Sequence, residues 1–392
     1  MNLESGFYLQ GPRFLERLTK INWLFILLIC CPACIGFLML YSAAGGSMDP
    51  WAKAQIIRFG IGFFVMVAIA LIDIRIILRF SYWGYALSLL LLLAVEILGS
   101  SAMGAQRWIA IGNFHLQPSE LMKIGLILGL ARYFSGITHE NMSKIRVYII
   151  PIILILLPVG LVLRQPDLGT AVLLVLIGLA IVFLAGIRLW KMLLCLGFLV
   201  GAVPIAWQFL REYQKVRVLN FINPESDSLG AGYHILQSKI ALGSGGVFGK
   251  GLMEGSQSHL NFLPEKQTDF IFTMLAEELG LAGALGVILL YLLIIGYGTF
   301  ISWRSNITFG RLLSIGVIVT FFLYAFVNIS MVMGLLPVVG VPLPLISYGG
   351  SAMLTLMVGF GFVLNVWINR DIKSIKRQGY FPVLNMLDSK KS

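Results

Sequence analysis

The chain contains 392 residues, of which 58% are hydrophobic and only 12% are charged, and its mean hydropathy is +0.89. This composition excludes a soluble globule with one ordinary core and predicts a helical protein that crosses a membrane several times. The net charge of +11 comes mainly from basic residues in loops and tails. Because these residues form no single stripe with aromatic side chains, a nucleic-acid-binding surface is excluded as well.

Long, continuous apolar runs with Gly and Pro inside them favour membrane helices over membrane strands. The polar segment before residue 21 is too long and too mixed in charge for a signal peptide, so we expect a retained first helix. The sequence therefore predicts an all-α polytopic integral membrane protein with a large extracytoplasmic loop between helices 7 and 8. About ten transmembrane helices are expected, at residues 21–41, 55–72, 80–98, 117–134, 147–163, 168–187, 190–209, 269–301, 311–336 and 348–368.

The distribution of Lys and Arg predicts the orientation of these helices. Most basic residues of the short loops lie on the side that both termini share, which is the pattern of cytoplasmic loops. We therefore expect cytoplasmic tails at residues 1–20 and 371–392 and a single membrane domain at residues 21–370. A periplasmic loop is expected at residues 210–268, so polar residues at that end of the helices face away from the cytosol.

The most informative stretch, residues 263–280 (LPEKQTDFIFTMLAEELG), joins the long loop to the eighth span. Four-residue spacing places Asp269, Thr273 and Glu277 on one helical face that is too polar for lipid. An acid entering a membrane helix is costly unless it faces water, a partner or a substrate, which favours a functional role for Asp269. The alternative is that Asp269 only caps the helix.

Polar residues also mark the start of the fourth span. Glu120 and Lys123 are three residues apart and share a helical face, so they either neutralise each other inside the bundle or line a cavity in which Lys123 meets an anion. These two interpretations are compatible. Arg107 and Trp108 precede this span and place a cation and an amphipathic ring at the outer surface.

Two further segments combine polar and small residues. Residues 164–170 (RQPDLGT) predict a tight turn that brings Arg164 and Asp167 to the same level, either as a local ion pair or as part of a site. Residues 342–351 (PLPLISYGGS) open the last span, and their small side chains favour close helix packing.

The long loop contains a short helix, predicted at residues 230–242, which carries Lys239 and is expected in the membrane interface. The glycine-rich residues 243–251 (GSGGVFGKG) superficially resemble a phosphate-binding loop. A flexible lid or turn is favoured, because Ser244 replaces the first Gly of a Walker motif and no strand precedes the segment.

Cysteine and histidine chemistry is not expected. Cys31 and Cys34 have C-x-x-C spacing, but their apolar surroundings favour small buried residues over a metal half-site or redox pair. None of the four His has ligand spacing with another His or Cys, which excludes zinc and metalloprotease sites, and a Ser-His-Asp site also lacks candidate residues.

Five separated motifs carry a family resemblance that extends over residues 20–370. They are residues 117–123 (QPSELMK), 165–170 (QPDLGT), 232–246 (GYHILQSKIALGSGG), the parts LPE, TDFIF and AEELG of residues 263–280, and 347–351 (SYGGS). In this order they resemble the shape, elongation, division and sporulation (SEDS) family. Residues 336–345 (LPVVGVPLPL) look more like its elongation branch, RodA, than its division branch, FtsW.

The resemblance implies a peptidoglycan glycosyltransferase that polymerises lipid II into glycan strands during cell elongation, on the outer face of the cytoplasmic (inner) membrane. It also implies a class B penicillin-binding protein as transpeptidase partner, together with the elongation machinery. A divalent cation, Mg²⁺ or Mn²⁺, is suggested as cofactor by resemblance only, with unknown ligands.

The resemblance also assigns residues. Asp269 matches the catalytic acid, and the positions expected to bind substrate are Glu120, Lys123, Arg107, Trp108, Asp167 and Lys239. Two departures from the family pattern are Gln267, where relatives often have His, and Asn261, where they often have an acid. Both departures argue against titration or metal binding at those neighbours of Asp269.

The implied reaction joins a sugar hydroxyl to an anomeric carbon that carries pyrophosphate. It needs one base and positive charge near the leaving oxygens, because pyrophosphate leaves as a stabilised anion. We expect Asp269 to take the proton of the acceptor 4-hydroxyl, while Lys123, Arg107 or a divalent cation stabilises the pyrophosphate. The alternatives are a flippase for lipid-linked precursors and a non-catalytic scaffold of a synthase complex.

Overall fold

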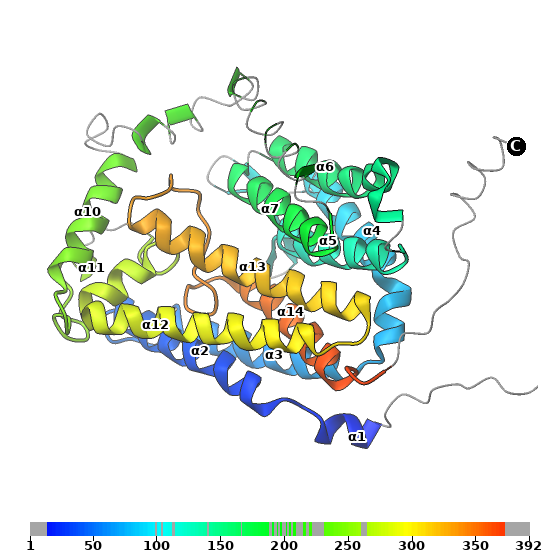
Figure 1. Ribbon diagram of the computed structural model, residues 1–392. Coiled ribbons are helices and arrows are strands. Elements are labelled where there is room, and N and C mark those ends of the chain that lie inside the picture. The colour runs from blue at the N-terminus through cyan, green and yellow to red at the C-terminus, as the bar shows by residue number, and fades with distance from the viewer. Residues whose placement is uncertain are drawn as a thin grey trace, which may run out of the picture.

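The structure is a computed structural model that describes residues 14–372, except residues 99, 103, 104, 112, 113, 139, 140, 166, 260–264 and most of the segment 188–230. It consists mainly of long helices packed in one bundle (Figure 1), and a small sheet connects two of them along the chain. The elements are α1 (Phe14–Thr19), α2 (Trp23–Ala43), α3 (Ala52–Leu71), α4 (Ile74–Leu98), β1 (Ser100–Ala102), β2 (Ala105–Ile111), β3 (Phe114–Leu116), α5 (Pro118–Ser135), η1 (Asn141–Ser143), η2 (Ile145–Tyr148), α6 (Ile149–Arg164), α7 (Leu168–Leu184), α10 (Ala231–Ser244), α11 (Ser256–His259), α12 (Ile271–Trp303), α13 (Thr308–Val332) and α14 (Gly350–Ile368).

The predicted polytopic all-α architecture is confirmed, although the number of ten spans is not. Within the described residues, seven helical segments are long and apolar enough to cross a membrane, namely α2, α3, α4, η2 with α6, α12, α13 and α14. Helix α7 is shorter, and α5 carries Glu120, Lys123 and Arg132. The expected span at residues 190–209 falls largely outside the described residues.

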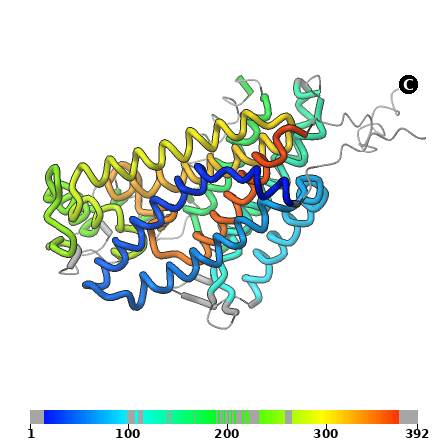
Figure 2. The backbone as a smooth tube through the Cα atoms, turned by 90° about the horizontal axis from the view of Figure 1, so that it is seen from below, coloured from blue at the N-terminus to red at the C-terminus, as the bar shows by residue number. Residues whose placement is uncertain are grey.

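The two ends of the bundle differ. Helices α10 and α11 and the start of α12 lie together at one end, whereas α1 and the end of α14 lie at the other (Figures 1 and 2). Asp269, which directly precedes the N-cap residue of α12, is therefore at the end opposite to both described ends of the chain.

The central and outer helices differ in how much of their surface is buried. Helices α5, α13 and α14 are buried over most of their length, whereas the outer helix α12 exposes leucines along one side, at Leu281, Leu285 and Leu289. Such an apolar outer face is what a lipid-exposed helix requires. The expectation of a buried Cys34 is wrong, because α2 lies on the outside of the bundle and exposes this thiol.

A small antiparallel sheet, which the sequence had not predicted, occupies the connection between α4 and α5. Strand β2 pairs with β1 on one side and with β3 on the other. Because β3 ends two residues before α5 begins, the sheet places Arg107 and Trp108, both on β2, beside the start of that central helix.

Candidate active site

Asp269 lies in a turn at residues 265–270, not in the helix that follows. Helix α12 starts at Ile271, and Phe270, rather than Asp269, occupies its N-cap position. The carboxylate of Asp269 is therefore on a half-buried turn instead of a helical face. In the same turn, burial lowers the pKa of the Lys266 ammonium, and the Glu278 carboxylate partly opposes that shift.

The other polar residues of the predicted face are fully buried by protein contacts. Thr273 Oγ1 lies 2.7 Å from Ser238 Oγ on α10. Glu277 accepts hydrogen bonds from Lys250 Nζ at 2.8 Å and from the backbone N–H of Gln257 at 2.9 Å. The predicted shared face thus packs against α10 and its following loop.

Two elements hold the turn of Asp269. Asn328 of α13 donates through Nδ2 to the carbonyl oxygens of Asp269, at 3.0 Å, and of Val341, at 2.7 Å. On the other side, Ser347 Oγ donates to the carbonyl oxygen of Thr268 at 2.6 Å. The segment 342–351 was expected to serve close helix packing, but its first part is a non-helical loop that supports the turn of Asp269.

Gly340 brings this loop directly against the carboxylate. Its φ of 71° lies in the left-handed region, where residues with a side chain are strained. A Cβ added at this position would lie 3.6 Å from Asp269 Oδ2. The loop backbone therefore approaches the carboxylate without an intervening side chain.

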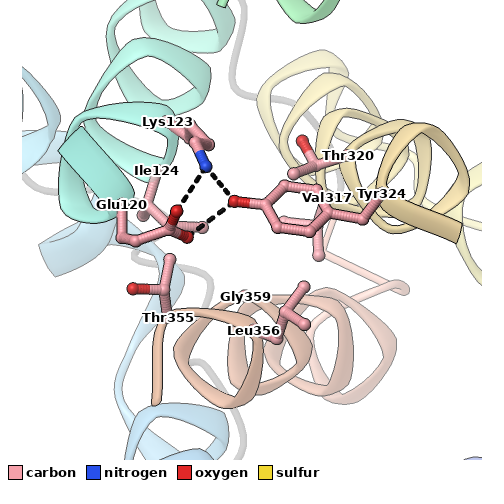
Figure 3. Close-up of a pocket in the computed structure, with 9 residues that line it drawn as sticks. All are labelled: Glu120, Lys123, Ile124, Val317, Thr320, Tyr324, Thr355, Leu356 and Gly359. Carbon is pink, nitrogen blue, oxygen red and sulfur yellow. Dashed lines mark hydrogen bonds and ion pairs between the residues drawn. The ribbon is translucent and has the colours of Figure 1, made fainter. Parts of the chain in front are cut away.

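Glu120, Lys123 and Tyr324 form a buried cluster between α5 and α13 (Figure 3). Lys123 Nζ lies 2.6 Å from Glu120 Oε1, and Tyr324 donates its hydroxyl to Glu120 Oε2 at 2.6 Å. Lys123 Nζ also bonds the Tyr324 hydroxyl. The two charges therefore neutralise each other inside the bundle, as one interpretation predicted. They also line a cavity of about 10 Å³, which has room for about one water, so its size does not support the other interpretation, in which Lys123 meets an anion there.

Asp167 and Arg107 form a second polar pair. Asp167 is the N-cap of α7, where its carboxylate accepts from the backbone N–H of Thr170 at 3.2 Å and from the Thr170 hydroxyl at 2.9 Å. Arg107 Nη1 lies 4.0 Å from Asp167 Oδ2, and Arg107 Nε donates to the carbonyl oxygen of Gln165 at 3.1 Å. Of the two alternatives for this turn, the local ion pair with Arg164 is wrong, because Arg107 on β2 supplies the cation.

Three consecutive loop residues connect these groups. A Cβ added to Gly169 would lie 2.8 Å from the carbonyl oxygen of Val339, so the loop contacts α7 two residues after Asp167. Gly340 faces Asp269, and Val341 accepts the hydrogen bond from Asn328. The loop at residues 339–341 therefore separates the start of α7 from the turn of Asp269 and touches both.

Lys239 lies apart from these contacts. Lys239 is exposed on α10, and its side chain lies over Gly334 at the end of α13, where an added Cβ would be 2.7 Å from Nζ. Trp108 is half-buried on β2 beside Arg107. Asn261, one of the two departures from the family pattern, lies outside the described residues.

The glycine-rich loop is a turn, as expected, and its backbone pairs with a broken helix. Helix α12 is interrupted at Gly280, where φ is 69°. The N–H groups of Lys250 and Gly251 donate to the carbonyls of Glu277 and Glu278, each at 3.1 Å. In return, the N–H groups of residues 281 and 282 donate to the carbonyls of residues 246 and 247, each at 3.0 Å. The loop therefore satisfies the helix break, which argues against a phosphate cradle.

Two polar residues of this region were missed in the sequence, namely Tyr324 and Asn328. They are four residues apart on the apolar helix α13, and both side chains face the site. That spacing of a phenol and an amide within a membrane span was a usable signal, because polar groups at such depth face the bundle interior.

The chain resembles proteins of known class over nearly its whole length. Residues 22–372 match the family described as cell cycle protein, which is labelled after FtsW, RodA and SpoVE. The peptidoglycan glycosyltransferase MrdB of Escherichia coli strain K12 is 45% identical over 340 residues, which cover 86% of this chain and 90% of that protein. MrdB of Helicobacter pylori strain J99 is 35% identical over 348 residues, which cover 86% and 87%.

Solved structures give the same assignment. A chain from the structure described as the structural coordination of polymerization and crosslinking by a peptidoglycan synthase complex superposes with a TM-score of 0.78 at 31% identity, covering 90% of this chain and 98% of that one. The crystal structure of the rod shape determining protein RodA of Thermus thermophilus gives 0.68 at 28% identity, covering 90% and 98%. The chain therefore belongs to the family of FtsW, RodA and SpoVE, the SEDS family that its motifs resemble.

Proposed function

We propose that this protein is a peptidoglycan glycosyltransferase that polymerises lipid II, with Asp269 as the general base. The observation that carries the role of Asp269 is the contrast with the two acids that follow it. Glu277 and Glu278 are 0% and 1% exposed, so neither carboxylate can meet a substrate. Asp269, by contrast, is only half-buried, and its turn is held in place from two sides. A general base needs both properties, because it must be within reach of the substrate and correctly positioned.

In the proposed reaction the acceptor 4-hydroxyl oxygen attacks the anomeric carbon of the donor with inversion. The bond from that carbon to the undecaprenyl pyrophosphate oxygen breaks, and the hydroxyl proton passes to Asp269. General-base assistance of this kind contributes roughly 10² to 10⁴ in rate. A second carboxylic acid is not required, because pyrophosphate departs as a stabilised anion.

Arg107 is better placed than Lys123 to meet that anion. The Arg107 side chain is 28% exposed, whereas Lys123 is 2% exposed and bonded to both Glu120 and Tyr324. Releasing a buried ammonium from its carboxylate is costly. We therefore assign Arg107 to the pyrophosphate and Lys123 to the internal cluster that supports the site.

The acidic residues of the site fit a divalent cation that is shared with the phosphates of the substrate. Within the described residues, no group of three or more His, Cys, Asp or Glu side chains could hold a metal ion. Mg²⁺ commonly binds through one or two carboxylates, substrate phosphates and water. Asp269 or Asp167 would supply the protein ligand, and the cation would neutralise charge on the leaving pyrophosphate.

We also propose a class B penicillin-binding protein as partner and the cytoplasmic (inner) membrane as location. The first is supported by the similarity to a chain of a peptidoglycan synthase complex. For orientation, we place both termini in the cytoplasm and Asp269 outside. The Lys and Arg distribution supports this, as does the position of Asp269 at the end of the bundle opposite to α1 and the end of α14.

A flippase is the second candidate function, and the contacts of the buried charges argue against it. A transport pathway needs polar groups that can reach a moving headgroup at mid-depth, yet Glu120 and Lys123 are bonded to each other and to Tyr324. Purified protein separates the possibilities when it is assayed with lipid II, alone and with its transpeptidase. Glycan polymer identifies a polymerase, lipid II movement across vesicles without polymer identifies a flippase, and neither activity identifies a scaffold.

A further inference from the structure

We infer that Asn328 is a positioning residue for the Asp269 carboxylate, a role that rests on the proposed glycosyltransferase function. The side chain of Asn328 is fully buried on α13 and contacts the turn of Asp269 through one amide nitrogen. It touches neither the carboxylate oxygens nor an exposed surface, so it acts on the reaction through the backbone that carries the base.

The amide nitrogen joins two separate segments. One hydrogen bond, of 3.0 Å, reaches the carbonyl oxygen of Asp269, and the other, of 2.7 Å, reaches the carbonyl oxygen of Val341. Val341 directly follows Gly340, whose backbone faces Asp269 Oδ2. The Asn328 side chain therefore links the backbone of the residue that bears the base directly to the loop that packs against its carboxylate.

The buried cluster of Glu120, Lys123 and Tyr324 fixes the position from which Asn328 makes these two hydrogen bonds. Tyr324, one turn earlier on α13, donates to Glu120 and also bonds Lys123 on α5. The face of α13 that presents Asn328 is thus fixed against a central helix by a buried charge cluster. Both hydrogens of Asn328 Nδ2 are donated to backbone carbonyls, so the orientation of this side chain is fixed and the two carbonyls follow the position of α13.

The acceptor of the same amide distinguishes Asn328 from an ordinary structural asparagine. Asn328 Oδ1 is buried and has no hydrogen-bond partner among the described residues. A buried acceptor without a partner is a cost to the fold, so the contribution of this residue to folding is smaller than its two donated bonds suggest.

Asn365 on α14 provides a matched control. It is also fully buried, and its Nδ2 donates to backbone carbonyls at the end of α3, those of Ile69, Ala70 and Ile72 at 3.0, 3.1 and 2.6 Å. It is therefore also a buried amide that bridges to backbone carbonyls, at a position where no proposed site residue lies, and it differs from Asn328 in that its Oδ1 accepts from Asn369 Nδ2 at 3.3 Å. A substitution at residue 365 reports what the loss of such a buried bridge costs the fold alone.

The test compares Asn328→Leu and Asn328→Ser with Asn365→Leu and Asn365→Ser in the full chain. Leu keeps the approximate volume and removes both donors, and Ser keeps one donor in a smaller side chain that preserves folding if Leu does not. Initial rates of lipid II polymerisation give kcat and KM, and thermal unfolding in detergent gives the folded fraction. A small displacement of a catalytic group costs about 100-fold in rate.

We expect both Asn328 variants to lose about 30- to 100-fold in kcat per folded molecule with KM changed by less than about threefold, while both Asn365 variants keep kcat. The inference is overturned if the Asn328 variants lose no more kcat than their Asn365 counterparts, or if neither Asn328 variant folds while the Asn365 variants do. Failure of the wild-type protein to polymerise lipid II would refute the proposed function instead.

Discussion

Tyr324 and Asn328 stand one helical turn apart on α13 and connect the buried Glu120–Lys123 pair to the turn of Asp269. The charge cluster and the proposed base are therefore not separate features of the bundle. A change in the cluster reaches Asp269 through a single face of one helix.

The first prediction concerns the hydroxyl of Tyr324. Tyr324→Phe keeps the ring but removes bonds to Glu120 and Lys123, and hydrogen bonds to charged groups contribute about 1.5–3 kcal/mol. We expect a lower melting temperature. We also expect a roughly tenfold slower polymerisation of lipid II per folded molecule, because the face of α13 that carries Asn328 loses its anchor on α5 and a displaced catalytic group lowers the rate.

Tyr133→Phe is the control for this substitution. The Tyr133 hydroxyl is also buried, but it donates at 2.8 Å to the neutral carbonyl oxygen of Val147, away from Asp269. This variant should lose only about 0.5–1.5 kcal/mol and keep its activity. Equal effects of the two substitutions on rate would contradict the connection through α13.

The second prediction concerns Arg107 as the group that meets the pyrophosphate. Arg107→Gln removes the charge but retains a hydrogen-bond donor, so kcat/KM for lipid II should fall by at least about tenfold. Arg304→Gln, at the far end of α12, removes an arginine that lies over the Phe300 ring and should leave kcat/KM unchanged. If the Arg107 variant retained wild-type kcat/KM, the anion would have to be bound elsewhere.

The third prediction concerns the bond between Lys250 and Glu277. Lys250→Met leaves the fully buried Glu277 carboxylate without its ammonium partner. Loss of one partner of a buried pair costs about 3–5 kcal/mol. Because the Lys250 side chain is 28% exposed, we expect the free energy of unfolding to fall by about 3 kcal/mol or less. The melting temperature should fall clearly.

Lys53→Met is the matched change at the surface. Lys53 lies 3.8 Å from Asp49, and their side chains are 63% and 72% exposed. Exposed pairs contribute about 0–1 kcal/mol, so the melting temperature should hardly change. A Lys250 variant as stable as the Lys53 variant would show that the loop at residues 245–251 does not depend on this bond.

The fourth prediction concerns the divalent cation. If Mg²⁺ or Mn²⁺ neutralises the leaving pyrophosphate, chelation should abolish polymerisation by the wild-type protein, and either ion should restore it. Because no cluster of three or more metal-binding side chains occurs in the described part of the chain, the melting temperature should not change on chelation without substrate. Activity that is unchanged by chelation would remove the cation from the mechanism.

Much of the fold was predictable because long apolar runs leave few alternatives to membrane helices. The sequence also placed Glu120 and Lys123 on one face, and the structure shows them bonded there. In both cases the information is local, since residues three or four apart on a helix are neighbours whatever surrounds them.

The parts that were not predictable depend on contacts between distant segments. Asp167 pairs with Arg107, 60 positions away, because a small sheet turns β2 towards α7, and short strands leave a weak sequence pattern. Likewise, Thr273 and Glu277 share a polar face as predicted, but only the packing of α10 and its loop shows that this face is covered.

The rate of lipid II polymerisation by Asp269→Asn, relative to the wild-type protein, tests the central claim most directly. The substitution keeps the shape of the side chain and removes the base, whereas Asp73→Asn, whose acid pairs with Arg17 at 2.9 Å near the other end of the bundle, serves as control. We predict a rate at least about 10²-fold lower for the folded Asp269 variant and a nearly unchanged rate for the control. A folded Asp269→Asn protein that polymerises lipid II at the wild-type rate would contradict the account.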